Sequence, residues 1–113
     1  MAADTKENLT AAKARMGAFA KASPNVMKAF GQLAGAATTE GRFTAAQKEL
    51  LATAIAVVEG CEDCILYHVD AARRQGAEEE ELVEALAIAV EMGGGPALMY
   101  AGKALECFRN LSS

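Results

Sequence analysis

Glycine and proline signals divide this chain into helix-length segments, and they constrain its fold more than any other feature. Ser23-Pro24, Gly41, Gly60, Gly76 and the run Gly93-Gly94-Gly95-Pro96 are separated by stretches rich in alanine and leucine. Alanine and leucine are strong helix formers, whereas glycine and proline interrupt or end helices. The chain has only two prolines, and its β-branched runs are short. We therefore predict an all-α fold of about six helices.

The six predicted helices cover roughly residues 5–20, 24–37, 44–58, 61–75, 78–90 and 96–108. Ser23 and Pro24 suit the N-cap and the first position of the second helix. Thr44-Ala-Ala-Gln47 fits a capping box at the start of the third. That third helix is apolar on nearly all sides, so we expect it to be central or buried between subunits.

Apolar side chains at helical spacing predict which faces are buried. The expected core positions are Leu9, Met16 and Phe19 in the first helix, a stripe from Val26 to Ala37 in the second, Leu82, Val83, Leu86, Ala89 and Val90 in the fifth, and Leu98, Ala101, Leu105 and Phe108 in the last. The triple glycine lacks the Gly-Lys-Ser/Thr ending of a phosphate-binding loop, so we interpret it as a corner between two helices.

Size and charge limit the classes of protein to consider. With 113 residues, of which 52% are hydrophobic, we expect residues 1–113 to form a single domain with a substantial core. The net charge of −4, with no basic cluster beyond Arg73-Arg74, argues against a nucleic-acid partner. The longest mostly apolar run, Leu50–Val58, is shorter than the roughly 20 residues that a spanning helix needs. We expect a cytoplasmic protein without a membrane partner.

The segment Glu59-Gly-Cys-Glu-Asp-Cys-Ile-Leu-Tyr-His68 holds two of the three cysteines and the single histidine. Cys61, Cys64 and His68 stand at i, i+3 and i+7, so they share one face of a helix. The positive end of the helix dipole favours a thiolate there. His68, one turn after Cys64, is placed to accept the thiol proton and return it later.

Glu49 is the candidate residue for orienting this histidine. If Gly60 turns the chain so that the helices on either side are antiparallel, His68 lies about 12 Å from the turn and Glu49 about 16 Å. The two side chains would then stand at nearly the same height. Glu49 has the apolar neighbours Leu50 and Leu51, and an unpaired carboxylate is costly in such surroundings.

The residues alone leave three interpretations open. The pair Cys61 and Cys64 can be a redox dithiol, part of a metal site with His68 and Glu49, or two small core cysteines beside a histidine. Structural zinc sites usually draw their ligands from two separated pairs, and the chain has no second pair. A c-type haem site needs histidine directly after the second cysteine, where Ile65 stands. The redox dithiol is favoured.

The pattern Glu49–x11–Cys61–x2–Cys64–x3–His68 resembles the signature of alkylhydroperoxidase D-like proteins, in the carboxymuconolactone decarboxylase superfamily. The resemblance covers roughly 43–108 and includes the segment EMGGGPALMYA. It implies an all-α fold that assembles as a homotrimer or homohexamer. It also implies peroxide reduction or disulfide exchange without a metal or organic cofactor.

The resemblance assigns a role to each matching residue. Cys64 would be the peroxidatic thiol, deprotonated through His68 and Glu49, and Cys61 would resolve its sulfenic acid to a disulfide. An external dithiol, such as a lipoyl or thioredoxin-like carrier, would regenerate the pair. The position before the second cysteine is often histidine in the peroxidases but is Asp63 here. Its negative charge opposes thiolate formation, so Asp63 is a candidate modulator of activity.

Two alternative functions come with the resemblance. The superfamily also contains lactone decarboxylases, but those members generally lack the cysteine pair, so Cys61 and Cys64 argue against decarboxylation. The non-enzymatic alternative is a metal-binding or purely structural oligomer. Cys107 has no cysteine near it in the sequence, and its apolar helix predicts a small buried residue.

Overall fold

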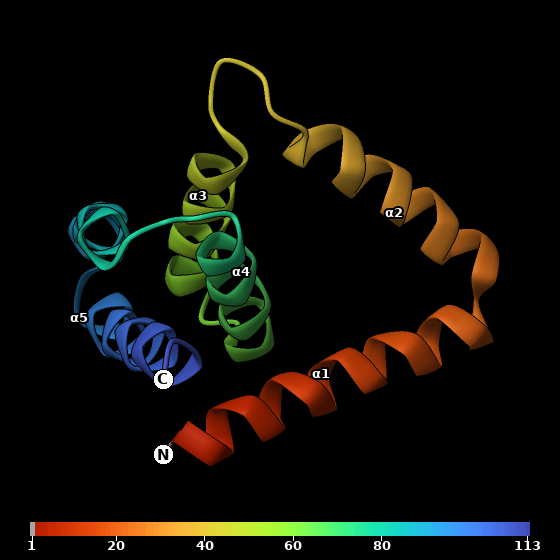
Figure 1. The fold of residues 1–113 in the computed structure, drawn as a ribbon, viewed down its shortest axis with the longest axis horizontal. Helices are drawn as coiled ribbons and strands as arrows, with labels where there is room; N and C mark the ends of the chain where they lie inside the picture. The colour runs from red at the N-terminus through yellow and green to blue at the C-terminus, as the bar shows by residue number, and fades with distance from the viewer. Residues whose placement is uncertain (1) are drawn as a thin grey trace.

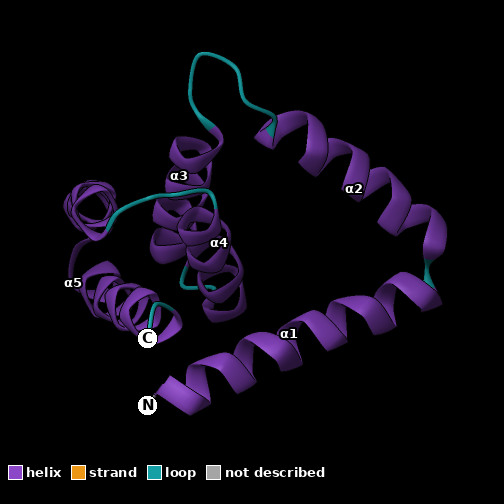
Figure 2. Ribbon diagram, viewed as in Figure 1, coloured by secondary structure: helices purple, strands orange, loops and turns teal. Residues whose placement is uncertain are grey.

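The computed structural model describes residues 2–113 and is all-helical, as predicted. The helices are α1 (Ala2–Ala22), α2 (Pro24–Thr38), α3 (Ala45–Glu59), α4 (Glu62–Arg74) and α5 (Glu79–Leu111). Figure 2 shows that short loops connect them and that the described residues contain no strand.

The break that the triple glycine predicts lies inside α5. Gly94 has φ 71° and ψ −151°, which are not helical values, and Pro96 follows two residues later. The two parts of α5 therefore run in different directions, as Figure 1 shows. Counted at this kink, α5 comprises the fifth and sixth predicted helices. By length and composition alone, the whole of α5 is long and apolar enough to cross a membrane. Each of its two parts, however, is shorter than the roughly 20 residues that a spanning helix needs.

The core lies where α3, α4 and α5 pack together, and α1 crosses beside α4 and the second part of α5 (Figure 1). Val57, Val69 and Leu82, from the three central helices, are completely buried. The two ends of the chain meet, because Asn110 donates a hydrogen bond to Thr5 (2.9 Å). The third helix was predicted to be central or buried between subunits. One face of α3, which carries Leu50, Thr53, Ala56 and Val57, is indeed buried in the core.

Local signals at the helix ends act largely as predicted. Thr44 and Gln47 form the reciprocal hydrogen bonds of a capping box before α3. Gly76 follows the end of α4 with φ 96°, the left-handed conformation that glycine adopts readily. Ser23 does occupy the N-cap of α2, with proline directly after it, but its side chain makes no capping hydrogen bond.

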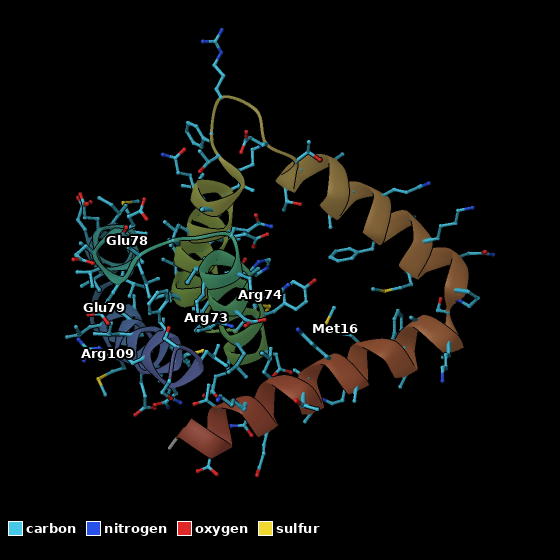
Figure 3. The ribbon with its side chains drawn as sticks, in the orientation of Figure 1. Met16, Arg73, Arg74, Glu78, Glu79 and Arg109 are labelled. Atoms are coloured by element: carbon cyan, nitrogen blue, oxygen red, sulfur yellow. A yellow bond between two sulfur atoms is a disulfide. The ribbon has the colours of Figure 1, made fainter. Side chains whose placement is uncertain are left out.

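Several predicted core positions are exposed in the single chain. In α2 no residue is buried, and Val26, Phe30 and Leu33 are each more than half exposed. The predictions for Met16, Phe19, Val83 and Leu98 are likewise wrong for this chain. Helix α2 contacts α1 and α3 but neither α4 nor α5, and the C-terminal part of α1 extends past the central helices, where Met16 points into the space between α1 and α2 (Figure 3). Val83 and Leu98 belong to α5 itself, on faces that the described helices leave exposed. Helical spacing identifies an apolar face but not the element that covers it.

Candidate active site

A glycine turn between α3 and α4 builds the frame of the site. Gly60 adopts a left-handed conformation (φ 72°, ψ 34°), and its N–H bonds to the carbonyls of Ala56 and Val57. A Cβ at this position would lie 3.2 Å from the Tyr100 ring, so both backbone and space favour glycine. The turn folds α4 back along α3, which confirms the predicted antiparallel arrangement of these two helices.

This arrangement brings Glu49 and His68 together from opposite arms of the hairpin. His68 Nδ1 lies 2.7 Å from Glu49 Oε1, so the predicted proximity is confirmed. Glu49 is well covered, with 12% of its side chain exposed, whereas His68 is 28% exposed. With Nδ1 engaged by the carboxylate, Nε2 is the ring nitrogen left for proton transfer. The Tyr67 ring packs edge-on against the imidazole at 5.3 Å between centroids.

The two cysteines lie at the beginning of α4. Cys61 is the N-cap residue, one position before the first helical residue, and its Sγ accepts a hydrogen bond from the Cys64 N–H (3.3 Å). Their Cα atoms are 5.2 Å apart, and the two sulfurs are joined in a disulfide. Cys64 packs against the core, while Cys61 is half-buried. The pair is thus held where the helix dipole favours a thiolate after reduction.

Both residues between the cysteines form ion pairs that the sequence did not indicate. Arg15 Nη2, from α1, donates to Asp63 Oδ2 at 2.9 Å. Lys103 Nζ, from α5, donates to Glu62 Oε1 at 2.6 Å. The cations are 48 and 41 residues from their partners, so no local pattern connects them.

A second polar cluster fastens α1 to α4 beyond the site. The buried Asp70 accepts hydrogen bonds from Arg73 (3.1 Å) and Arg74 (3.0 Å), and Lys13 of α1 lies 3.5 Å away. Burial raises the pKa of Asp70, but the hydrogen bonds from Arg73 and Arg74 outweigh burial, so the pKa is lowered overall. Lys13 also lies 5.9 Å from the centre of the Tyr67 ring.

Other residues of the chain are separate from this constellation. Cys107 is buried, as predicted, and burial raises the pKa of its thiol to about 12. Within residues 2–113, no three His, Cys, Asp or Glu side chains are grouped so that they could hold a metal ion. A hollow of about 430 Å³ lies beside Phe43 and Leu51. A second one, of about 170 Å³, is lined by Cys107 and also by the Glu62–Lys103 pair, but neither hollow is lined by Cys64 or His68.

Comparisons with known proteins identify the family. The sequence pattern of the carboxymuconolactone decarboxylase family matches residues 24–106. An uncharacterised protein of Cupriavidus necator is 48% identical over 113 residues, which cover all of both chains. The uncharacterised protein 4 of the cox locus of Paracoccus denitrificans is 38% identical over 94 residues, covering 83% of this chain and 85% of that protein.

Solved structures agree with this assignment. A carboxymuconolactone decarboxylase family protein of Legionella pneumophila superposes with a TM-score of 0.93 at 40% identity, covering 97% of this chain and 98% of that one. A family member from Thermotoga maritima, described as possibly involved in antioxidative response, superposes with a TM-score of 0.82 at 28% identity, covering 92% of this chain and 89% of that one. The chain therefore belongs to the carboxymuconolactone decarboxylase family.

Proposed function

We propose that this chain is a thiol-dependent oxidoreductase that reduces peroxides or exchanges disulfides through Cys61 and Cys64. The observation that carries the proposal is the 2.7 Å contact between Glu49 and His68, one helical turn beyond Cys64. A histidine oriented by a carboxylate beside a thiol is the arrangement that activates a cysteine nucleophile. The description of the Thermotoga maritima relative as possibly involved in antioxidative response is consistent with this chemistry.

The proposed cycle starts from the reduced pair. His68 takes the proton of the Cys64 thiol, and the thiolate attacks one peroxide oxygen. The S–O bond forms as the O–O bond breaks, and the leaving alkoxide takes the proton from His68 to become an alcohol. Cys64 is then a sulfenic acid. The Cys61 sulfur then attacks the Cys64 sulfur. The S–O bond breaks, the hydroxyl group takes up the Cys61 proton and leaves as water, and the disulfide forms.

The disulfide needs two electrons and two protons to return to the dithiol. An external dithiol supplies them by thiol–disulfide exchange and becomes a disulfide itself. We propose a lipoyl or thioredoxin-like carrier of the cytoplasm for this role. In the disulfide-exchange version of the function, a disulfide substrate takes the place of the peroxide. The Cys64 thiolate attacks one substrate sulfur, Cys61 then attacks Cys64 in the mixed disulfide, and the substrate leaves reduced as the Cys61–Cys64 disulfide forms.

We also propose that the chain works as a homo-oligomer, a trimer or a hexamer. Leu51, Ile55 and Val58 form an exposed apolar stripe along α3, and Phe30 and Leu33 of α2 are exposed in the same way. Soluble monomers rarely expose so many large apolar side chains together. Packing against a second copy of this chain would bury these faces.

The name of the family points to a second reaction, lactone decarboxylation. Such a reaction has no use for a dithiol, so it would persist when both Cys61 and Cys64 are replaced. The proposed function predicts the opposite result.

The decisive experiment counts thiols in the reduced protein before and after one equivalent of peroxide. We expect two thiols per chain to be lost, with a Cys61–Cys64 bridge identified by mass spectrometry. Cys64→Ser should abolish the loss, and His68→Gln should slow it. Cys107→Ala is the matched control, because this buried thiol lies outside the site, and it should react like the wild type. An unchanged rate in Cys64→Ser would refute the proposal.

A further inference from the structure

The Cys-x-x-Cys segment carries two carboxylates, and each meets a cation from a different helix. Asp63 is bound by Arg15 of α1 at 2.9 Å, and Glu62 by Lys103 of α5 at 2.6 Å. All four side chains are more than half exposed. Helices α1 and α5, which are far apart in the sequence, thus both contact the segment from Cys61 to Cys64.

The charges at this position act directly on the thiols. Glu62 and Asp63 occupy the first turn of α4, where negative charge suits the helix dipole. The same negative charge, next to Cys61 and Cys64, disfavours the thiolate form. A cation held against each carboxylate cancels most of this penalty and leaves the helix dipole to favour the thiolate.

A purely structural role explains these two pairs poorly. Exposed ion pairs contribute little to the free energy of folding, because water screens them and ordering long side chains costs entropy. The hydrogen bond to Glu62 raises the pKa of the Lys103 ammonium group, so this cation stays charged throughout the neutral range. Arginine is charged at all relevant pH values.

The other titratable groups around the dithiol have different partners. Glu49 of α3 is bonded to His68 of α4, and Tyr100 of α5 lies beside Gly60 with Lys103 above its ring. Helix α2 does not pack against α4. Among the described residues, Arg15 and Lys103 are the cations that contact the two carboxylates of the motif.

We propose that Arg15 and Lys103 are positioning residues of the dithiol, which neutralise Asp63 and Glu62 and so keep Cys64 in its reactive thiolate form at neutral pH. This inference rests on the proposed thiol function. It also changes the effect expected of Asp63 on the thiols. A carboxylate that is paired with a guanidinium opposes thiolate formation much less than an isolated carboxylate does.

The test measures the pKa of Cys64 without any peroxide. The rate of alkylation by iodoacetamide is followed against pH in the reduced protein, with the Cys64 adduct identified by mass spectrometry. Arg15→Gln should raise the pKa of Cys64 by about half a unit, the effect of a unit charge at about 7 Å in water. Arg15→Lys should retain most of the wild-type value, and added salt should reduce the difference between Arg15→Gln and wild type.

Two comparisons make the test specific. In an Asp63→Asn background, Arg15→Gln should cause a smaller shift, because without Asp63 the exposed Arg15 guanidinium is no longer held beside the thiols. Arg109→Gln is the matched control. It breaks a similar pair, with Glu79, that joins the start and the end of α5 (Figure 3) and involves neither Glu62 nor Asp63, so it should leave the Cys64 pKa unchanged.

The Lys103–Glu62 pair is tested in the same way with Lys103→Gln and a Glu62→Gln background. An unchanged Cys64 pKa in both Arg15→Gln and Lys103→Gln would overturn the inference. An equal shift with and without the partner carboxylate would overturn it as well. Because no peroxide is involved, these results are separate from the thiol-counting experiment, whose failure would refute the proposed function itself.

Discussion

Replacing Gly94 by alanine should destabilise the fold, because this residue forms the kink that directs the second part of α5. Its φ of 71° and ψ of −151° lie in a region that essentially only glycine adopts. Holding a residue with a side chain there costs about 1–3 kcal/mol. An added Cβ would meet no atom within 4 Å, so the expected cost is backbone strain rather than collision.

For a chain of this length, each kcal/mol lowers the melting temperature by about 4 °C, so Gly94→Ala should melt about 4–12 °C below the wild type. Thermal unfolding followed by circular dichroism measures this difference. Gly102→Ala is the matched control, because Gly102 also belongs to α5, has no positive φ and has open space around it. It should stabilise the helix by about 0.5–1 kcal/mol. A Gly94→Ala protein that melts at or above the wild-type temperature would refute the reasoning.

Four further measurements probe the relay, the buried ion cluster, the apolar face and the third cysteine. Glu49→Gln should slow peroxide-dependent thiol loss about 100-fold or more, as stopped-flow kinetics would show, since a neutral amide orients but does not stabilise the imidazolium. Because the pKa of Asp70 is lowered in the fold, its contribution to stability is complete above its ordinary value of 3.8 and is lost as the pH falls through the lower folded value. The free energy of unfolding, measured by denaturant titration, should therefore fall more between pH 7 and pH 2 in the wild type than in Asp70→Asn, and an equal fall in both would contradict this role of Asp70. Ile55→Glu should shift the protein toward monomer in light scattering, and an unchanged mass would contradict assembly through this face. Cys107 should resist alkylation at pH 8 in the native protein and react only after unfolding, since its thiol has a pKa of about 12.

The core of the candidate site was predictable because it depends on local geometry. Cys61, Cys64 and His68 lie on one helix, where a spacing of three and four residues brings side chains to one face. The prediction that Glu49 is the partner of His68 needed one further assumption, that Gly60 reverses the direction of the chain. Equal helical rise on either side of the turn then puts Glu49 opposite His68, and the 2.7 Å contact agrees.

The electrostatic surroundings of the dithiol were not predictable in this way. Asp63 looked like an isolated negative charge beside a thiol. Its partner Arg15 lies 48 residues away on a helix whose apolar pattern is weak. Nothing in the spacing of α1 indicates that it crosses the beginning of α4, since that contact depends on how α1 packs against both α4 and α5.

The sequence by itself determined the helices, their limits near glycine and proline, the break at Gly94 and the shared face of the cysteines and histidine. These features follow from backbone conformation and helical period, which act over a few residues. The tertiary structure alone decided which apolar faces are buried and which remain open, as in α2, where an amphipathic pattern has no buried residue. It also decided that Arg15 and Lys103 meet the carboxylates between the cysteines, because burial and charge pairing depend on contacts between helices that are distant along the chain.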